Sequence, residues 1–141
     1  MPDTYIYEKR NWYPHMKPRD VAIWIRFLEQ FPDMYERVQY DVHVGGTPPF
    51  DPTVSEERNT DMSALYKRKI DVVGLKGDQI DIIELKPDAD ASAVGQLLMY
   101  RKLYVEDFAP TVAPKLIIVT DKVKPDVLAF AKEMGVFMVE V

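Results

Sequence analysis

The stretch KRKIDVVGLKGDQIDIIELKP, residues 67–87, holds two β-branched runs on either side of Gly77-Asp78. Such runs around a Gly-Asp pair predict a β-hairpin with a two-residue loop. Counting outward from that loop places Asp71 directly opposite Glu84. Directly opposed Cβ atoms are about 4.5–5.5 Å apart, a distance at which two carboxylates destabilise a sheet. The pair is therefore either solvated at an edge or used to hold a cation.

Apolar periodicity predicts the elements on both sides of this hairpin. Apolar residues that recur at intervals of three and four indicate amphipathic helices, and alternating or continuous β-branched runs indicate strands. The predicted helices are 19–31, 91–106 and 125–134, and the predicted strands are 35–44, the two strands of the hairpin 68–86, 115–120 and 136–141. This order of elements predicts an α/β fold with a mixed central sheet and helices on both faces.

The length of the chain indicates how these elements are organised into domains. With 141 residues the chain can bury one sizeable core, and we expect a single domain over 1–141. Residues 1–18 are expected to form an irregular N-terminal arm. Residues 45–66 are rich in Pro, Thr, Ser and acidic side chains, and they predict a long loop that is either a substrate-contacting lid or a disordered insertion.

The composition excludes several classes of site. The absence of cysteine excludes disulfides, thiolate zinc sites and iron–sulfur clusters. The net charge of −5 argues against a protein that coats nucleic acid, but it is compatible with an enzyme whose basic residues are local. The sequence does not open with a basic segment followed by an apolar one, and no apolar run is long enough to span a bilayer. We therefore expect a cytoplasmic protein without membrane contact.

Three motifs follow one another along the predicted elements. They are Asp71 on the first strand of the hairpin, Glu84-Leu85-Lys86 on its second strand, and Gln96-x-x-x-Tyr100 on the next helix. Together with the element order, these motifs resemble the PD-(D/E)XK nuclease superfamily, whose restriction-endonuclease-like fold has an αβββαβ core. The resemblance covers residues 19–120. The Gln-x-x-x-Tyr motif is similar to that of the lambda-exonuclease and recombination-exonuclease branch, whereas Ile70 stands where the superfamily motif has proline.

The resemblance implies a Mg²⁺-dependent deoxyribonuclease, acting in replication, recombination, repair or phage-type DNA processing. Mg²⁺ prefers oxygen ligands, and it promotes phosphodiester hydrolysis by activating water and neutralising charge. Asp71 and Glu84 would bind the ion together with the main-chain carbonyl of Leu85, and Mn²⁺ would substitute for Mg²⁺. Lys86 would orient the attacking water and stabilise negative charge.

The flanking helices add further candidates. Gln96 and Tyr100 are four residues apart, so a helix places them on one face, where they would reach a phosphate or the attacking water. The alternative is an amphipathic helix that buries Tyr100 against the sheet. In many members of the superfamily an acidic residue of the first helix joins the metal site. Glu29 is the residue expected to do so here, although Asp33 and Glu36 compete with it.

Basic residues surround the candidate site in sequence. The candidate nucleic-acid contacts are Lys67, Arg68, Lys69, Arg101 and Lys102. They would contact phosphates, although Arg101 and Lys102 are also compatible with the solvated face of a helix. The sequence shows no recognition helix or zinc finger, so we expect DNA to be recognised by its backbone or shape. A homodimer would favour a junction-cutting endonuclease, and a higher oligomer or partner motor would favour an exonuclease.

Two functions of other classes compete with a nuclease. The chain could be a non-catalytic nucleic-acid-binding or assembly module that retains the nuclease fold. The joint presence of Asp71, Glu84 and Lys86 argues against that alternative, because a retired site is expected to lose at least one of them. The chain could also be an unrelated α/β ligand-binding or assembly protein, in which the hairpin charges are merely solvated.

Overall fold

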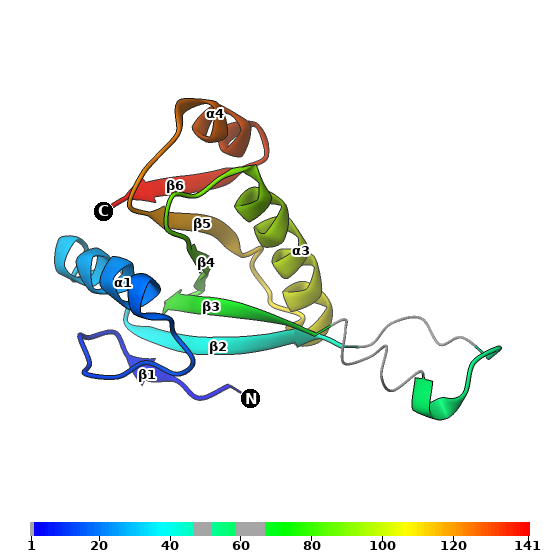
Figure 1. Ribbon diagram of the computed structural model, residues 1–141. Coiled ribbons are helices and arrows are strands. Elements are labelled where there is room, and N and C mark those ends of the chain that lie inside the picture. The colour runs from blue at the N-terminus through cyan, green and yellow to red at the C-terminus, as the bar shows by residue number, and fades with distance from the viewer. Residues whose placement is uncertain (1, 47–51, 59–66) are drawn as a thin grey trace.

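The computed structural model describes residues 2–46, 52–58 and 67–141. The first and last of these ranges form one mixed sheet with helices on both faces (Figure 1). The strands are β1 (Tyr5–Ile6), β2 (Arg37–Gly45), β3 (Lys67–Lys76), β4 (Gln79–Leu85), β5 (Lys115–Thr120) and β6 (Val136–Glu140), and the helices are α1 (Pro18–Gln30), α3 (Ala91–Phe108) and α4 (Pro125–Glu133). The strands lie in the order in which they occur in the sequence. They run antiparallel from β1 to β4 and parallel from β4 to β6.

The predicted fold class is confirmed, and the element boundaries differ from the predicted ones by a few residues at most. The short strand β1 was not predicted, because two residues carry no periodic signal. Helix α3 begins after Asp90, whose carboxylate accepts the main-chain N–H of Ser92 at 3.0 Å. It ends two residues beyond the predicted end, where Ala109 adopts a left-handed conformation.

The predicted loop 45–66 falls largely on residues 47–51 and 59–66, which lie outside the described residues. No helix in the described parts of the chain combines the length and apolar character needed to cross a membrane.

The hairpin between β3 and β4 has the predicted register. Lys76 pairs with Gln79 across the two-residue turn, and the paired residues continue as far as Val72 and Ile83. Gly77 has a φ of 56°, a value that glycine adopts at no steric cost. The next residues beyond Val72 and Ile83 are the two acids, so the register places the carboxylates side by side where regular pairing ends.

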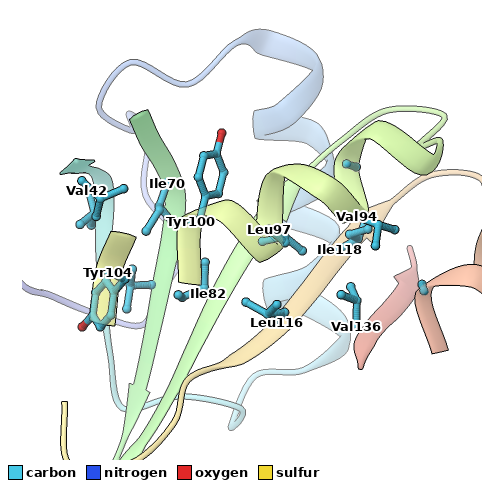
Figure 2. Close-up of a cluster of buried hydrophobic side chains, with 14 of the residues drawn as sticks. Val42, Ile70, Ile82, Val94, Leu97, Tyr100, Tyr104, Leu116, Ile118 and Val136 are labelled. Carbon is cyan, nitrogen blue, oxygen red and sulfur yellow. The ribbon is translucent and has the colours of Figure 1, made fainter. Parts of the chain in front are cut away.

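Two apolar clusters fix the sheet from opposite faces. One cluster lies between the sheet and helices α3 and α4, with Val94 and Leu97 of α3 packed over Ile82, Leu116 and Ile118 (Figure 2). The other lies between the sheet and helix α1, and aromatic side chains of α1 and of the N-terminal arm dominate it. The middle of β4 is covered on both sides, which is why every residue from Asp81 to Leu85 is buried.

Gly74 of β3 leaves room for the ring of Tyr35. A Cβ atom at Gly74 would lie 2.5 Å from the nearest ring carbon. The ring is held in place because the Tyr35 hydroxyl donates a hydrogen bond of 2.7 Å to the buried carboxylate of Asp81. We expect Gly74→Ala to lower the free energy of unfolding by about 1–3 kcal/mol, as measured by urea denaturation.

Gly95 provides the matched control, since it lies in the exposed interior of α3 and a Cβ atom there would meet nothing within 4 Å. Gly95→Ala should therefore raise stability by about 0.5–1 kcal/mol. Equal unfolding midpoints for the two variants would contradict this packing of Tyr35 on Gly74.

Candidate active site

A cavity of about 690 Å³ opens at the end of the hairpin where β3 and β4 cease to pair. Asp71, Glu84 and Lys86 line it from the end of the hairpin, Gln96 lines it from α3, and the first turn of α1 lines it as well. The structure therefore brings together four of the five predicted catalytic residues. A concave site of this size with converging polar groups is the usual form of a ligand or substrate site.

The carboxylate of Asp71 shapes the end of the hairpin. Its Oδ2 accepts the main-chain N–H of Leu85 at 2.9 Å, so a side chain takes the hydrogen bond at the point where pairing with β3 stops. The main-chain N–H of Lys86 donates instead to the carbonyl of Val119 on β5, at 3.0 Å. These two bonds hold Leu85 and Lys86 at the floor of the cavity.

The acidic pair is buried, and this controls its protonation. Glu84 is only 8% exposed. Burial raises the pKa of Glu84, the charge of Asp71 raises it further, and Lys86 opposes the shift. Burial also raises the pKa of Asp71, against the stabilising hydrogen bond from Leu85. The two carboxyls also act on each other's pKa, and a pair of neighbouring buried carboxylates keeps a proton unless a cation neutralises it.

One atom of the pair has no partner. Oε2 of Glu84 is buried and accepts no hydrogen bond within the described residues. Buried polar atoms are almost always satisfied, and exceptions often mark a catalytic group or an ion site. Glu84 lines the same cavity as Lys86.

Sequence reasoning missed the acidic residue that α1 contributes. Asp20, in the first turn of α1, lines the cavity, and burial raises the pKa of its carboxyl despite the nearby charges of Lys17 and Lys86. Glu29, the predicted residue, lies nine positions further on, about 14 Å along the helix axis. It forms an ion pair of 3.6 Å with Lys9 and lines a separate pocket. The structure thus does not bring Glu29 to the candidate metal site.

Gln96 and Tyr100 have different environments although they share one face of α3. Gln96 is exposed and lines the cavity. Tyr100 is buried in the apolar cluster beneath α3, with its hydroxyl directed away from the apolar side chains (Figure 2). Burial and the charges of Glu84 and Asp71 raise the pKa of its phenol to about 12, so the phenol stays protonated near neutral pH. Tyr100 therefore packs against the sheet, which agrees with the alternative of an amphipathic helix. Its phenol is also close enough to the two acids for their charges to affect its pKa.

The predicted basic contacts are dispersed. Arg101 and Lys102 line another pocket on α3, and Lys102 forms an ion pair with Glu106 one turn away. Lys69 is exposed on β3 and pairs in register with His43 of β2. The charge of Arg68 acts on the phenol of Tyr100. The side chain of Lys67 lies outside the described part of the chain.

The basic rim of the cavity comes from another part of the sequence. Lys17 and Arg19, at the start of α1, line the cavity together with Lys86. Both are exposed. Their signal in the sequence is weak, since basic residues before a helix are common and the direction in which the first turn faces depends on tertiary packing.

The metal-binding capacity of the site is limited to a few protein ligands. Within residues 2–46, 52–58 and 67–141, no three His, Asp or Glu side chains are grouped closely enough to hold a metal ion by themselves. The predicted metal ligands Asp71, Glu84 and Leu85 all line the cavity, and Asp20 lines it as well.

Comparisons with known proteins address the fold. The chain matches a repair endonuclease from Pyrococcus abyssi with a TM-score of 0.52 at 17% identity, over 92% of this chain and 49% of that one. It matches EndoMS, solved in complex with dsDNA, with a TM-score of 0.50 at 17% identity, over 94% and 49% of the two chains. The fold is restriction-endonuclease-like.

A third chain with this restriction-endonuclease-like arrangement is a protein of unknown function, AF1548, which matches with a TM-score of 0.50 at 18% identity over 85% of this chain and 56% of that one. The present chain thus spans about half the length of these neighbours. No family model and no curated protein matches the sequence. A shared fold does not specify chemistry, so the function of this chain depends on the residues of the site itself.

The buried acids predict how stability depends on pH. Because burial raises the folded-state pKa of both carboxyls above their ordinary values of about 4, the pair favours the folded state at low pH, and this contribution is lost as pH rises through the folded pKa values. In a chelating buffer we expect the Tm to fall between about pH 5 and pH 8.5, and Glu84→Gln to flatten this fall.

Glu133→Gln, at an exposed position of α4, removes the same formal charge far from the pair and should keep the wild-type slope. A Glu84→Gln protein with the wild-type dependence of Tm on pH would contradict the buried pair.

Proposed function

We propose that this chain is a nuclease domain that hydrolyses phosphodiester bonds of DNA with the help of a divalent cation. The observation that carries the proposal is the orphaned, buried Oε2 of Glu84 beside Asp71, in a cavity that also admits the ammonium of Lys86. An acidic pair with one unsatisfied oxygen suits a cation, and a neighbouring amine suits a reaction that develops negative charge.

The donor set favours Mg²⁺, with Mn²⁺ as a substitute. Mg²⁺ is usually held by one or two carboxylates and keeps several waters, so it does not need a cage of three or more protein side chains. Asp71 and Glu84 would hold the ion with the carbonyl of Leu85. Asp20, which lines the same cavity, would add negative charge to it. When bound, the cation would polarise the phosphate and make the attacking water easier to deprotonate.

The residues of the chain then have distinct roles. Lys86, on the floor of the cavity, donates to the attacking oxygen and stabilises the charge that builds up on the phosphate. Gln96 offers an amide that can position a phosphate oxygen or the water. Tyr100 keeps its proton near neutral pH, so its hydroxyl can donate a hydrogen bond, and its ring also supports α3 against the sheet. Lys17 and Arg19 neutralise the phosphates on either side.

DNA is the proposed substrate because two chains of the same fold are a repair endonuclease and a protein solved in complex with dsDNA. The same likeness favours endonuclease over exonuclease action, and a role in repair, recombination, replication or phage-type DNA processing in the cytoplasm. The Gln96-x-x-x-Tyr100 motif is the feature that favours an exonuclease of the lambda type. A homodimer would place two such cavities on one substrate, as paired incision requires.

Lys86 provides the test of catalysis. Purified protein with Mg²⁺ or Mn²⁺ should cleave at least one of four labelled substrates, which are single-stranded, duplex, flap and four-way-junction DNA. Lys86→Ala should reduce the rate about 10²–10³-fold, because it removes the charge that stabilises the transition state. Lys115→Ala is the matched control, since Lys115 is exposed at the opposite end of the sheet, beside Asp81.

The hypothesis of catalysis fails if no substrate is cut with either metal, or if Lys86→Ala cuts as fast as the wild type. DNA binding without any cleavage would favour a non-catalytic module that retains the fold.

Glu84 provides a test of the cation that does not depend on activity. Mg²⁺ should raise the Tm of the wild-type protein at about pH 8, because an ion that binds only the folded state stabilises it. Glu84→Gln should lose this increase and Glu133→Gln should keep it. An equal increase in Tm for all three proteins would place the cation elsewhere.

A further inference from the structure

Trp12 is exposed to solvent, although the residue that follows it packs against the sheet. Trp12 is 70% exposed, whereas Trp24 of α1 is fully buried. Tryptophan is large and mostly apolar, so an open indole on a well-packed surface is one of the features that mark binding sites.

The exposure of Trp12 does not come from a loose chain end. The next residue, Tyr13, is 3% exposed and packs edge-on against Tyr40 of β2, with ring centroids 5.4 Å apart. The Tyr13 hydroxyl accepts the main-chain N–H of Arg10 at 2.8 Å. Trp12 therefore lies in a short turn that is closed by a hydrogen bond and anchored by a buried ring. Such a turn can hold an aromatic face ready for a ligand at little entropic cost.

The same segment leads directly to the cavity. His15, Lys17 and Arg19 line the cavity wall, and the arm runs beside β1 and β2 before it reaches the start of α1 (Figure 1). His15 is three positions after Trp12, so their Cα atoms are at most about 10–11 Å apart. A nucleic-acid strand covers that distance in about three stacked nucleotides, at about 3.4 Å each.

The cations of the arm divide into paired and free groups. Lys9 forms an ion pair with Glu29, and Arg10 forms one with Glu8. Lys17 and Arg19 have no ion pair within 4 Å among the described residues, although the chain as a whole carries a net charge of −5. In the sequence these unpaired cations follow Trp12, and in the structure they line the cavity that also holds the two acids.

We propose that Trp12 stacks on an unpaired base while Lys17 and Arg19 hold the adjoining phosphates, so that the arm selects DNA with single-stranded nucleotides next to the site of cleavage. This inference rests on the proposed function and names its substrate class. An indole can stack only on a base whose face is open, as in single strands, flaps and frayed ends. In a continuous duplex the neighbouring bases cover both faces.

The surroundings of Trp12 favour nucleic acid over a protein partner. Hot spots of protein interfaces are ringed by contacts that exclude water. Trp12 instead adjoins the exposed Asn11, and the residues that follow toward the cavity include the exposed His15 and Lys17. An aromatic platform beside free cations is the usual arrangement for single-stranded nucleic acid.

Tryptophan fluorescence tests the proposal on the intact chain in a chelating buffer, where no cleavage occurs. Oligothymidylate of about 12 nucleotides, within the usual range of single-strand sites, should quench the solvent-exposed emission of the wild type. Trp12→Phe leaves Trp24 as the only indole, and its emission should not change. Trp12→Ala should bind the oligonucleotide about 5- to 150-fold more weakly, the range of one lost stacking contact.

Two controls make the result specific. Phe137→Ala removes another exposed aromatic residue, on β6, and should leave the affinity unchanged. Trp12→Phe should keep most of the affinity, since a phenyl ring still stacks. A blunt duplex of equal length should bind the wild type and Trp12→Ala proteins equally.

The free cations provide a second readout. Each phosphate contact to a single strand contributes about 0.7 to the slope of log affinity against log salt concentration. Lys17→Ala combined with Arg19→Ala should lower that slope by about 1.4.

Unchanged single-strand affinity in Trp12→Ala, or an equal loss for duplex, would overturn the proposal. A Trp12-dependent self-association or capture of another protein, without effect on oligothymidylate, would also overturn it. The binding assay is independent of catalysis. Metal-dependent cleavage without a role for Trp12 would therefore support the nuclease proposal and overturn the proposed role of Trp12. Trp12-dependent binding without cleavage would support the role of Trp12 and overturn the nuclease proposal.

Discussion

The hydrogen bond from the Leu85 N–H to the carboxylate of Asp71 is the contact on which the candidate site depends. Strands β3 and β4 pair regularly up to Val72 and Ile83, and the side chain of Asp71 then takes the place of a main-chain acceptor. The strands can separate there without leaving the N–H of Leu85 unsatisfied, which would be costly in a buried position. Glu84 and Lys86 line the cavity at this point, while β4 remains paired with β5 on its other side.

The rest of the fold stabilises an arrangement that is unfavourable by itself. Two acids with raised pKa values and an unsatisfied oxygen cost stability wherever both are charged. They are kept in place because β4 lies in the middle of the sheet, with one apolar cluster on each side. Local backbone strain adds to this cost. Asp41 of β2, which the register places beside Asp71, has a φ of 51° in the middle of a strand. Strained residues of this kind often occur at functional sites.

The site combines two segments with different tasks. The hairpin supplies the acids and the lysine, whose positions are fixed by the sheet. The N-terminal arm and the first turn of α1 supply Asp20, the free cations and the exposed indole. Chemistry on rigid strands and substrate contacts on a separate wall allow specificity to vary while the acids stay in place. Such variation is consistent with a chain that shares its fold, at 17–18% identity, with longer proteins of different descriptions.

The sequence determined the local and periodic features of this protein. The Gly77-Asp78 turn set the register that places Asp71 beside Glu84, and the apolar periods set the helices and the order of strands. Tertiary structure decided which residues of the flanking segments reach the cavity and which are buried, because apolar periodicity does not encode these placements. The packing of α1 across the sheet brings Asp20 to the cavity and carries Glu29 away from it, because only one end of a straight helix can face the site. Tertiary packing also buries Tyr13 while it leaves the adjacent Trp12 exposed. Hairpin register follows from hydrogen bonds between near neighbours, whereas these placements depend on contacts between residues far apart in the chain.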